Sequence, residues 1–115
     1  MTTRSSNEPQ IADLVFVGFN RKVVALDRYT GQTVWSWKAP RSGSPVIMLD
    51  GDRLVVSING YMFCLDPVFG QLVWANELRG MGVGIPSLAS LRGGSVGSSR
   101  HQTISNQQQA SNAAT

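Results

Sequence analysis

Two stretches of the chain decide its fold, because they repeat one pattern. The first reads Ala25-Leu26-Asp27-Arg28-Tyr29-Thr30-Gly31-Gln32-Thr33-Val34-Trp35, and the second reads Cys64-Leu65-Asp66-Pro67-Val68-Phe69-Gly70-Gln71-Leu72-Val73-Trp74. Aligning Asp27 with Asp66 gives an offset of 39 residues, and the same offset pairs Asn20 with Asn59. The chain therefore contains two copies of one supersecondary unit.

Around these stretches, short apolar segments are interrupted every few residues by Gly, Asn, Asp or Pro. This pattern is typical of β-strands joined by tight turns, and no sustained period of 3.6 residues indicates a long helix. We expect strands at about 13–19, 22–27, 32–38, 45–49, 53–58, 61–66, 71–77 and 85–91.

A repeat of about forty residues with four short strands indicates a blade of a β-propeller, whose faces neighbouring blades must cover. The sequence predicts an all-β unit over 11–91 with two four-stranded antiparallel blades, repeats 13–38 and 45–77. Ile85-Pro86-Ser87-Leu88-Ala89 begins a third copy that is not finished. We expect homo-oligomerisation to close the ring.

The repeated motif resembles the tryptophan-docking repeat of the PQQ-like, or quinoprotein, β-propellers, in which Ala, Asp, Thr-Gly and Trp recur at this spacing. The second copy departs from that pattern with Cys64 for Ala and Phe69 for Thr. The resemblance covers roughly residues 11–91 and implies the propeller fold rather than a particular reaction.

Six residues of the motif have predicted structural roles: Asp27, Gly31, Trp35, Asp66, Gly70 and Trp74. The aspartates are placed to accept hydrogen bonds from amides of the following turn, and the glycines suit a positive φ. The tryptophans present large apolar surfaces for docking on the next blade.

The way the ring closes follows from the ends of the patterned region. The first blade has three strands and no innermost one, because residues 1–10 are polar and include Pro9. The surplus strand 85–91 is expected to complete the next subunit's blade rather than to pair within its own chain, burying Ile85, Leu88 and Leu91. Eight blades from a homotetramer are favoured over six from a homotrimer.

The rest of the chain indicates few partners. The polar 1–10 segment has no apolar leader pattern, which favours the cytoplasm, and no apolar run is long enough to cross a membrane. The net charge is +3, but the basic residues are scattered, so nucleic acid is an unlikely partner. Residues 92–115, including His101, are expected to be disordered. Loop positions place three arginines on one possible anion-binding face: Arg21, Arg41 and Arg79.

Other candidate sites have simpler interpretations. Asp50-Gly51-Asp52 is a hairpin signal, Gly80-Met81-Gly82-Val83-Gly84 lacks the Lys and Ser or Thr of a phosphate loop, and Cys64 is a small buried side chain. The sequence predicts no catalytic residue and no metal site.

Two main functional hypotheses remain. The first is a non-catalytic scaffold, assembled from identical chains, that binds a protein or a ligand and needs no cofactor. The second, from the resemblance, is a quinoprotein dehydrogenase or its remnant, holding pyrroloquinoline quinone with calcium. Alcohol dehydrogenases of that family have a vicinal disulfide, an Asp base and Glu and Asn metal ligands, whereas this chain has one cysteine and no matching acidic cluster. A product with little function of its own is a third hypothesis.

Overall fold

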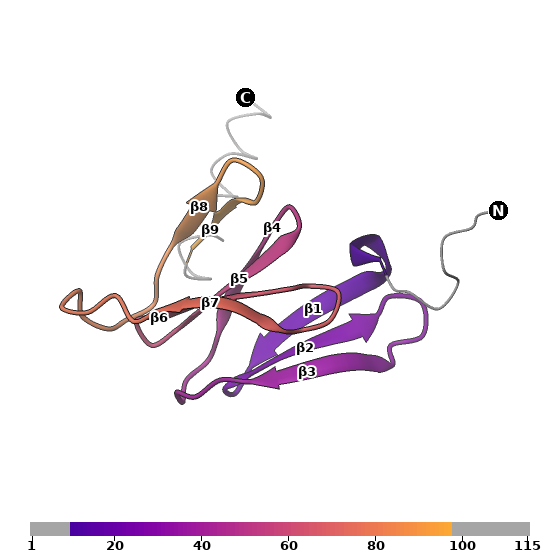
Figure 1. The fold of residues 1–115 in the computed structure, drawn as a ribbon, viewed down its shortest axis with the longest axis horizontal. Coiled ribbons are helices and arrows are strands. Elements are labelled where there is room, and N and C mark those ends of the chain that lie inside the picture. Colours follow the sequence, from indigo (N-terminus) through magenta and orange to yellow (C-terminus); the bar gives the residue numbers. More distant parts are fainter. Residues whose placement is uncertain (1–9, 98–115) are drawn as a thin grey trace, which may run out of the picture.

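Two antiparallel sheets lie against each other in the computed structural model, which describes residues 10–97 (Figure 1). The first sheet has the order β1-β2-β3, and the second has the order β4-β5-β6-β7. The first contains β1 (Leu14–Phe19), β2 (Lys22–Asp27) and β3 (Thr33–Lys38) after a short 3-10 turn, η1 (Ile11–Asp13). The second contains β4 (Val46–Asp50), β5 (Arg53–Ile58), β6 (Tyr61–Leu65) and β7 (Leu72–Asn76).

The internal repeat is visible in the strands. β1, β2 and β3 occupy the same repeat positions as β5, β6 and β7, and both copies have a β-bulge at the same place, between Ala25 and Leu26 and between Cys64 and Leu65. Seven expected strands are confirmed within one residue at each end. Hydrophobic alternation was therefore sufficient to locate them, because each sheet has two distinct faces.

The core lies between the two sheets. β5 and β6 contribute Leu54, Val56, Ile58, Phe63 and Leu65, and the first sheet packs Phe16, Val23, Trp35 and Trp37 against them. The rings of Trp37 and Phe63 meet edge to face with centroids 5.1 Å apart. The two repeats thus share one core and form one unit.

The first sheet contains three strands within the described residues, as expected for a first blade without its innermost strand. The described residues therefore form one four-stranded sheet and not two, which corrects the expectation of two four-stranded blades in one chain. The first sheet lacks an equivalent of β4, which is an edge strand of the second sheet. Residues 1–9, which precede η1, lie outside the described residues. Residues 10–97 form these two sheets and a two-stranded sheet, β8-β9, and they do not close a ring.

The segment after β7 differs from the expected lone strand 85–91. β8 (Leu88–Ser90) is shorter and pairs with β9 (Gly94–Val96) of the same chain, so the expectation that it lacks a partner in its own chain is wrong. Gly94, at φ +71°, permits the tight return, and the Ser90 hydroxyl accepts the Gly93 N–H at 2.8 Å. Ile85 and Leu91 are exposed in the single chain.

β9 also corrects the start of the predicted disordered tail, since residues 92–97 form the turn and second strand of this hairpin. The remainder of that segment, 98–115 with His101, lies outside the described residues. Between residues 10 and 97 there is no α-helix, and no helix there is long and apolar enough to cross a membrane.

Candidate functional site

The two motif turns have nearly identical geometry. The Asp27 carboxylate accepts the amides of Tyr29 and Thr30 at 2.8 and 3.1 Å, and the Asp66 carboxylate accepts those of Val68 and Phe69 at 2.8 and 3.4 Å. The glycines close both turns with φ +78° at Gly31 and +76° at Gly70. Each turn is therefore built by its own residues.

Trp35 lies on the turn of the second copy. Its indole N–H donates to the Pro67 carbonyl oxygen at 2.9 Å, and its ring packs so closely that a Cβ on Gly70 would lie 2.4 Å from Trp35 Cδ2. Phe16 supports the indole from its own sheet, with ring centroids 6.1 Å apart. Position 70 therefore requires glycine for two reasons: its φ is positive, and the Trp35 indole occupies the space where a Cβ would lie.

Trp74 has the same repeat position, but no further motif turn follows it within residues 10–97. Its side chain is 46% exposed, at the outer edge of the second sheet. At the other end of the row, no described residue lies within 4 Å of where a Cβ on Gly31 would be, so residues 10–97 leave the first turn uncovered. The chain therefore presents an indole at one end and a vacant turn at the other.

The sheet faces around these two ends carry groups of apolar side chains, and the outward face of the first sheet also carries Lys22, Ser36 and Lys38. Strand alternation puts Val55, Met62, Cys64 and Trp74 on the face of the second sheet that points away from the first. On the opposite end of the chain, alternation puts Val15, Val17, Phe19, Val24 and Leu26 on the outward face of the first sheet. Val15 and Phe19 are about half exposed.

The outward-facing residues of the first sheet were not identified as a site from the sequence. They occupy the same repeat positions as Leu54, Val56, Ile58, Phe63 and Leu65, which form the core between the two sheets. The sequence does contain a signal for them: subtracting 39 from the residue numbers of these core residues on β5 and β6 gives the outward-facing residues on β1 and β2.

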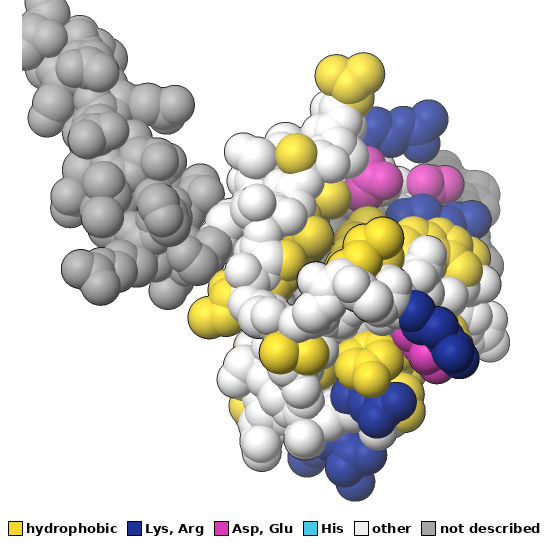
Figure 2. All heavy atoms as spheres, turned by 90° about the vertical axis from the view of Figure 1, so that its left-hand side faces the viewer, with side chains coloured by type: hydrophobic (Ala, Val, Ile, Leu, Met, Phe, Trp, Pro, Cys, Tyr) yellow, Lys and Arg dark blue, Asp and Glu magenta, His cyan; other side chains and the backbone are white. Residues whose placement is uncertain are grey.

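The three predicted arginines belong to the connections β1–β2, β3–β4 and β7–β8. These connections lie on the side opposite the motif turns (Figure 1). Each arginine has a partner there. Arg21 Nε donates to the Ala39 carbonyl at 2.6 Å, the Arg41 guanidinium lies 4.4 Å from the Tyr61 ring centroid, and Arg79 pairs with Glu77 at 3.1 Å. Figure 2 shows this side, with basic side chains in separate groups among hydrophobic ones. Anion binding by this face stays a prediction.

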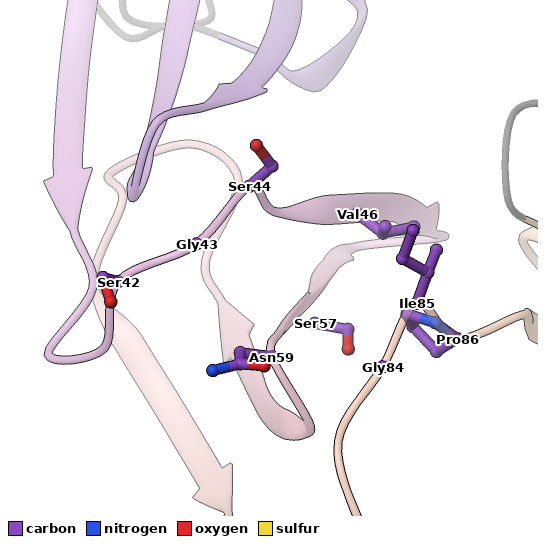
Figure 3. A pocket seen from close by; sticks show the side chains of 9 residues that line it. All are labelled: Ser42, Gly43, Ser44, Val46, Ser57, Asn59, Gly84, Ile85 and Pro86. Carbon is purple, nitrogen blue, oxygen red and sulfur yellow. The ribbon is translucent and has the colours of Figure 1, made fainter.

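A pocket opens on the same side, between the β5–β6 turn and the segments that enter β4 and β8 (Figure 3). Its walls carry hydroxyl, amide and apolar groups from nine residues: Ser42, Gly43, Ser44, Val46, Ser57, Asn59, Gly84, Ile85 and Pro86. None of these side chains titrates near neutral pH. The arrangement offers hydrogen bonds and apolar contact to a ligand, and it offers no acid or base for chemistry.

The carboxylates outside the motif turns are engaged locally. Asp50 accepts the Ser90 hydroxyl at 2.7 Å, and Asp52 lies 3.7 Å from both Arg53 and Arg92. Among residues 10–97, no three His, Cys, Asp or Glu side chains gather as a metal site would require. The described residues thus hold no cluster that fits the calcium ion suggested by the resemblance.

Cys64 is a free, buried cysteine on β6. Burial raises the pKa of its thiol above the ordinary value, and the nearby Arg53 lowers it only in part. The thiol is therefore protonated at neutral pH and a poor nucleophile.

Comparison with known proteins gives one match. The sequence model of a family of PQQ-like repeats, described as outer membrane protein assembly factor BamB, matches residues 3–107. Neither the curated proteins nor the solved structures contain a match.

Proposed function

Because the chain belongs to this family of PQQ-like repeat proteins, we propose that it is a non-catalytic β-propeller scaffold. Several identical chains join their blades into one ring, and the ring binds a protein or a ligand. Four chains with eight blades are favoured, and three chains with six blades are the next possibility.

One observation supports this proposal above the others: the chain has unsatisfied blade faces at both ends. On the outward face of the second sheet Trp74 is 46% exposed, although Cys64 beside it is buried, and on the outward face of the first sheet Val15 and Phe19 are about half exposed. The repeat equivalents of Val15 and Phe19, Leu54 and Ile58, lie in the core between the two sheets. Exposed apolar faces of this kind mark interaction sites.

The solution mass of the full chain tests the assembly. The chain mass is 12.4 kDa, and multi-angle light scattering is expected to give four times that value, or three times for the smaller ring. A single species at the chain mass over the micromolar range would overturn the proposal.

The binding role has a separate test. The pocket at Asn59 and the arginines on the same side supply hydrogen bonds and positive charge, which favour a polar or anionic ligand on that side. Replacing Arg21, Arg41 and Arg79 together by Gln is expected to weaken binding of acidic peptides several-fold at low salt. Unchanged binding would contradict an anion-binding face.

The quinoprotein alternative is tested with the same protein. Titration with pyrroloquinoline quinone and calcium is expected to leave the quinone absorbance unchanged, and a dye-linked alcohol oxidation assay is expected to show no turnover. Saturable binding together with turnover would favour the enzyme instead. The cytoplasmic assignment is likewise a proposal, which cell fractionation tests.

A further inference from the structure

We propose that identical chains join head to tail, with Trp74 of one copy seated on the Asp27–Gly31 turn of the next. This inference rests on the proposed function and names the surfaces through which it is carried out. The occupant of the open face around Trp74 is thus a second copy of this chain.

The joint inside the chain is the template for the joint between chains. Trp35 lies against Gly70 and donates its indole N–H to the Pro67 carbonyl. At the 39-residue offset, Gly70 corresponds to Gly31 and Pro67 to Arg28. The Trp74 indole would therefore pack on Gly31 of the next copy and donate to its Arg28 carbonyl.

The receiving turn is already in the shape that the indole needs. The φ values of Gly31 and Gly70 differ by two degrees, and both turns have the same Asp-to-amide hydrogen bonds. No described residue lies within 4 Å of where a Cβ on Gly31 would be, so residues 10–97 leave room there for an indole. The turn does not have to rearrange to receive a tryptophan.

The sheet faces that would come together are also complementary in kind. Val55 and Met62, both half-buried, share this face with Trp74 at the positions of Phe16 and Val23, which line the joint inside the chain. Cys64, at the position of Ala25, is already buried in the single chain. The outward face of the first sheet, which would receive Trp74, has five apolar residues at the positions of the second sheet's core residues: Val15, Val17, Phe19, Val24 and Leu26. Each chain thus carries both halves of one interface, on opposite ends.

The β8–β9 hairpin contacts the second sheet at a different edge. Its turn meets β4, where Ser90 donates to Asp50 and a Cβ on Gly93 would lie 2.7 Å from the Leu49 carbonyl oxygen and 3.0 Å from Met48 Cγ. The hairpin therefore covers the β4 side of the outward face and buries Met48. β4 and β7 are the two opposite edges of the sheet, so Trp74 on β7 is left exposed. Because the two halves of the interface differ, the association is heterologous and continues until a ring closes.

Two variants test the two halves separately, and a third controls for backbone strain. Trp74→Ala removes the indole. Gly31→Asn fills the seat, while asparagine tolerates the positive φ of that turn. Gly80→Asn places the same residue at φ +78° in open space away from the proposed joint. Far-UV circular dichroism verifies that all three variants are folded.

Light scattering over a dilution series measures association of the full chain and of each variant. Loss of a central tryptophan contact is expected to weaken association by about 30-fold or more. Trp74→Ala and Gly31→Asn are therefore expected at the chain mass in a range where the unmodified chain and Gly80→Asn are assembled.

Mixing the two defective variants gives the sharpest test. Trp74→Ala retains a good seat and Gly31→Asn retains a good indole, so one functional joint can form between them. An equimolar mixture is expected to give a heterodimer and nothing larger, although each variant alone stays at the chain mass.

The outcomes separate the two proposals. If the unmodified chain does not associate, the proposed function fails, and this inference fails with it. If the unmodified chain associates and either variant associates equally well, the scaffold proposal stands and the Trp74–Gly31 joint is wrong. A mixture that stays at the chain mass also overturns the joint.

Discussion

Trp35 and Trp74 have the same position in two copies of one motif, yet their surroundings differ. Trp35 is half-buried on the Gly70 turn, with its N–H bonded to Pro67, whereas Trp74 is 46% exposed. The turns that precede them are almost superimposable in φ and in hydrogen bonding. The difference teaches that a motif builds its own turn but depends on the next blade to bury its tryptophan.

The largest expected effect comes from removing the two tryptophans in turn. In a Gly31→Asn background, which blocks the proposed joint, Trp35→Ala is expected to lower the free energy of unfolding by about 3–5 kcal/mol, because it empties part of the shared core. Trp74→Ala is expected to change it by less than about 1 kcal/mol. Urea denaturation followed by circular dichroism measures both, and equal losses would contradict the comparison.

Alanine at the two turn glycines separates backbone strain from packing. Gly31→Ala is expected to cost about 1–2 kcal/mol, since only the positive φ is disturbed. Gly70→Ala is expected to cost about 1–3 kcal/mol more, because its Cβ would collide with the Trp35 ring. The same denaturation experiment applies, and a Gly31→Ala cost equal to that of Gly70→Ala would show that the indole contact is unimportant.

The turn aspartates are expected to behave alike, unlike the tryptophans. Asp27→Ala and Asp66→Ala each remove hydrogen bonds to turn amides and are expected to cost about 1 kcal/mol. Asn at the same positions retains an accepting oxygen and serves as the matched control. A difference above about 1 kcal/mol between the two alanine variants would show that the turns are not equivalent.

The smallest effect is expected where the copies differ at one buried position, Ala25 and Cys64. Cys64→Ala makes the second copy like the first and is expected to cost about 1 kcal/mol or less.

The thiol also predicts a dependence on pH. Because burial raises its pKa in the folded chain, the unfolded chain releases the proton first, and stability falls as pH rises above the ordinary thiol pKa. Stability curves between pH 7 and 10 are expected to fall more steeply for the native sequence than for Cys64→Ala. Parallel curves would contradict this.

Local structure was readable from the sequence. The alternation of apolar residues located β1 to β7 within one residue, and the 39-residue repeat identified the family. These features depend on contacts between residues that are close in sequence or paired by a short turn. The β8–β9 hairpin was missed because its second strand, Gly94–Val96, has little apolar character.

The sequence by itself determined the strands, the two Asp-to-Gly turns and the repeated face of each sheet, because each is set by short-range sterics and hydrogen bonds. Only the tertiary structure decided which tryptophan is packed on a motif turn within the chain and which stays exposed. Trp35 finds a turn in its own chain, while Trp74 and Gly31 are left at opposite ends of the row. Burial is a property of neighbours, and a motif repeated in sequence has different neighbours at each end of a finite row of blades.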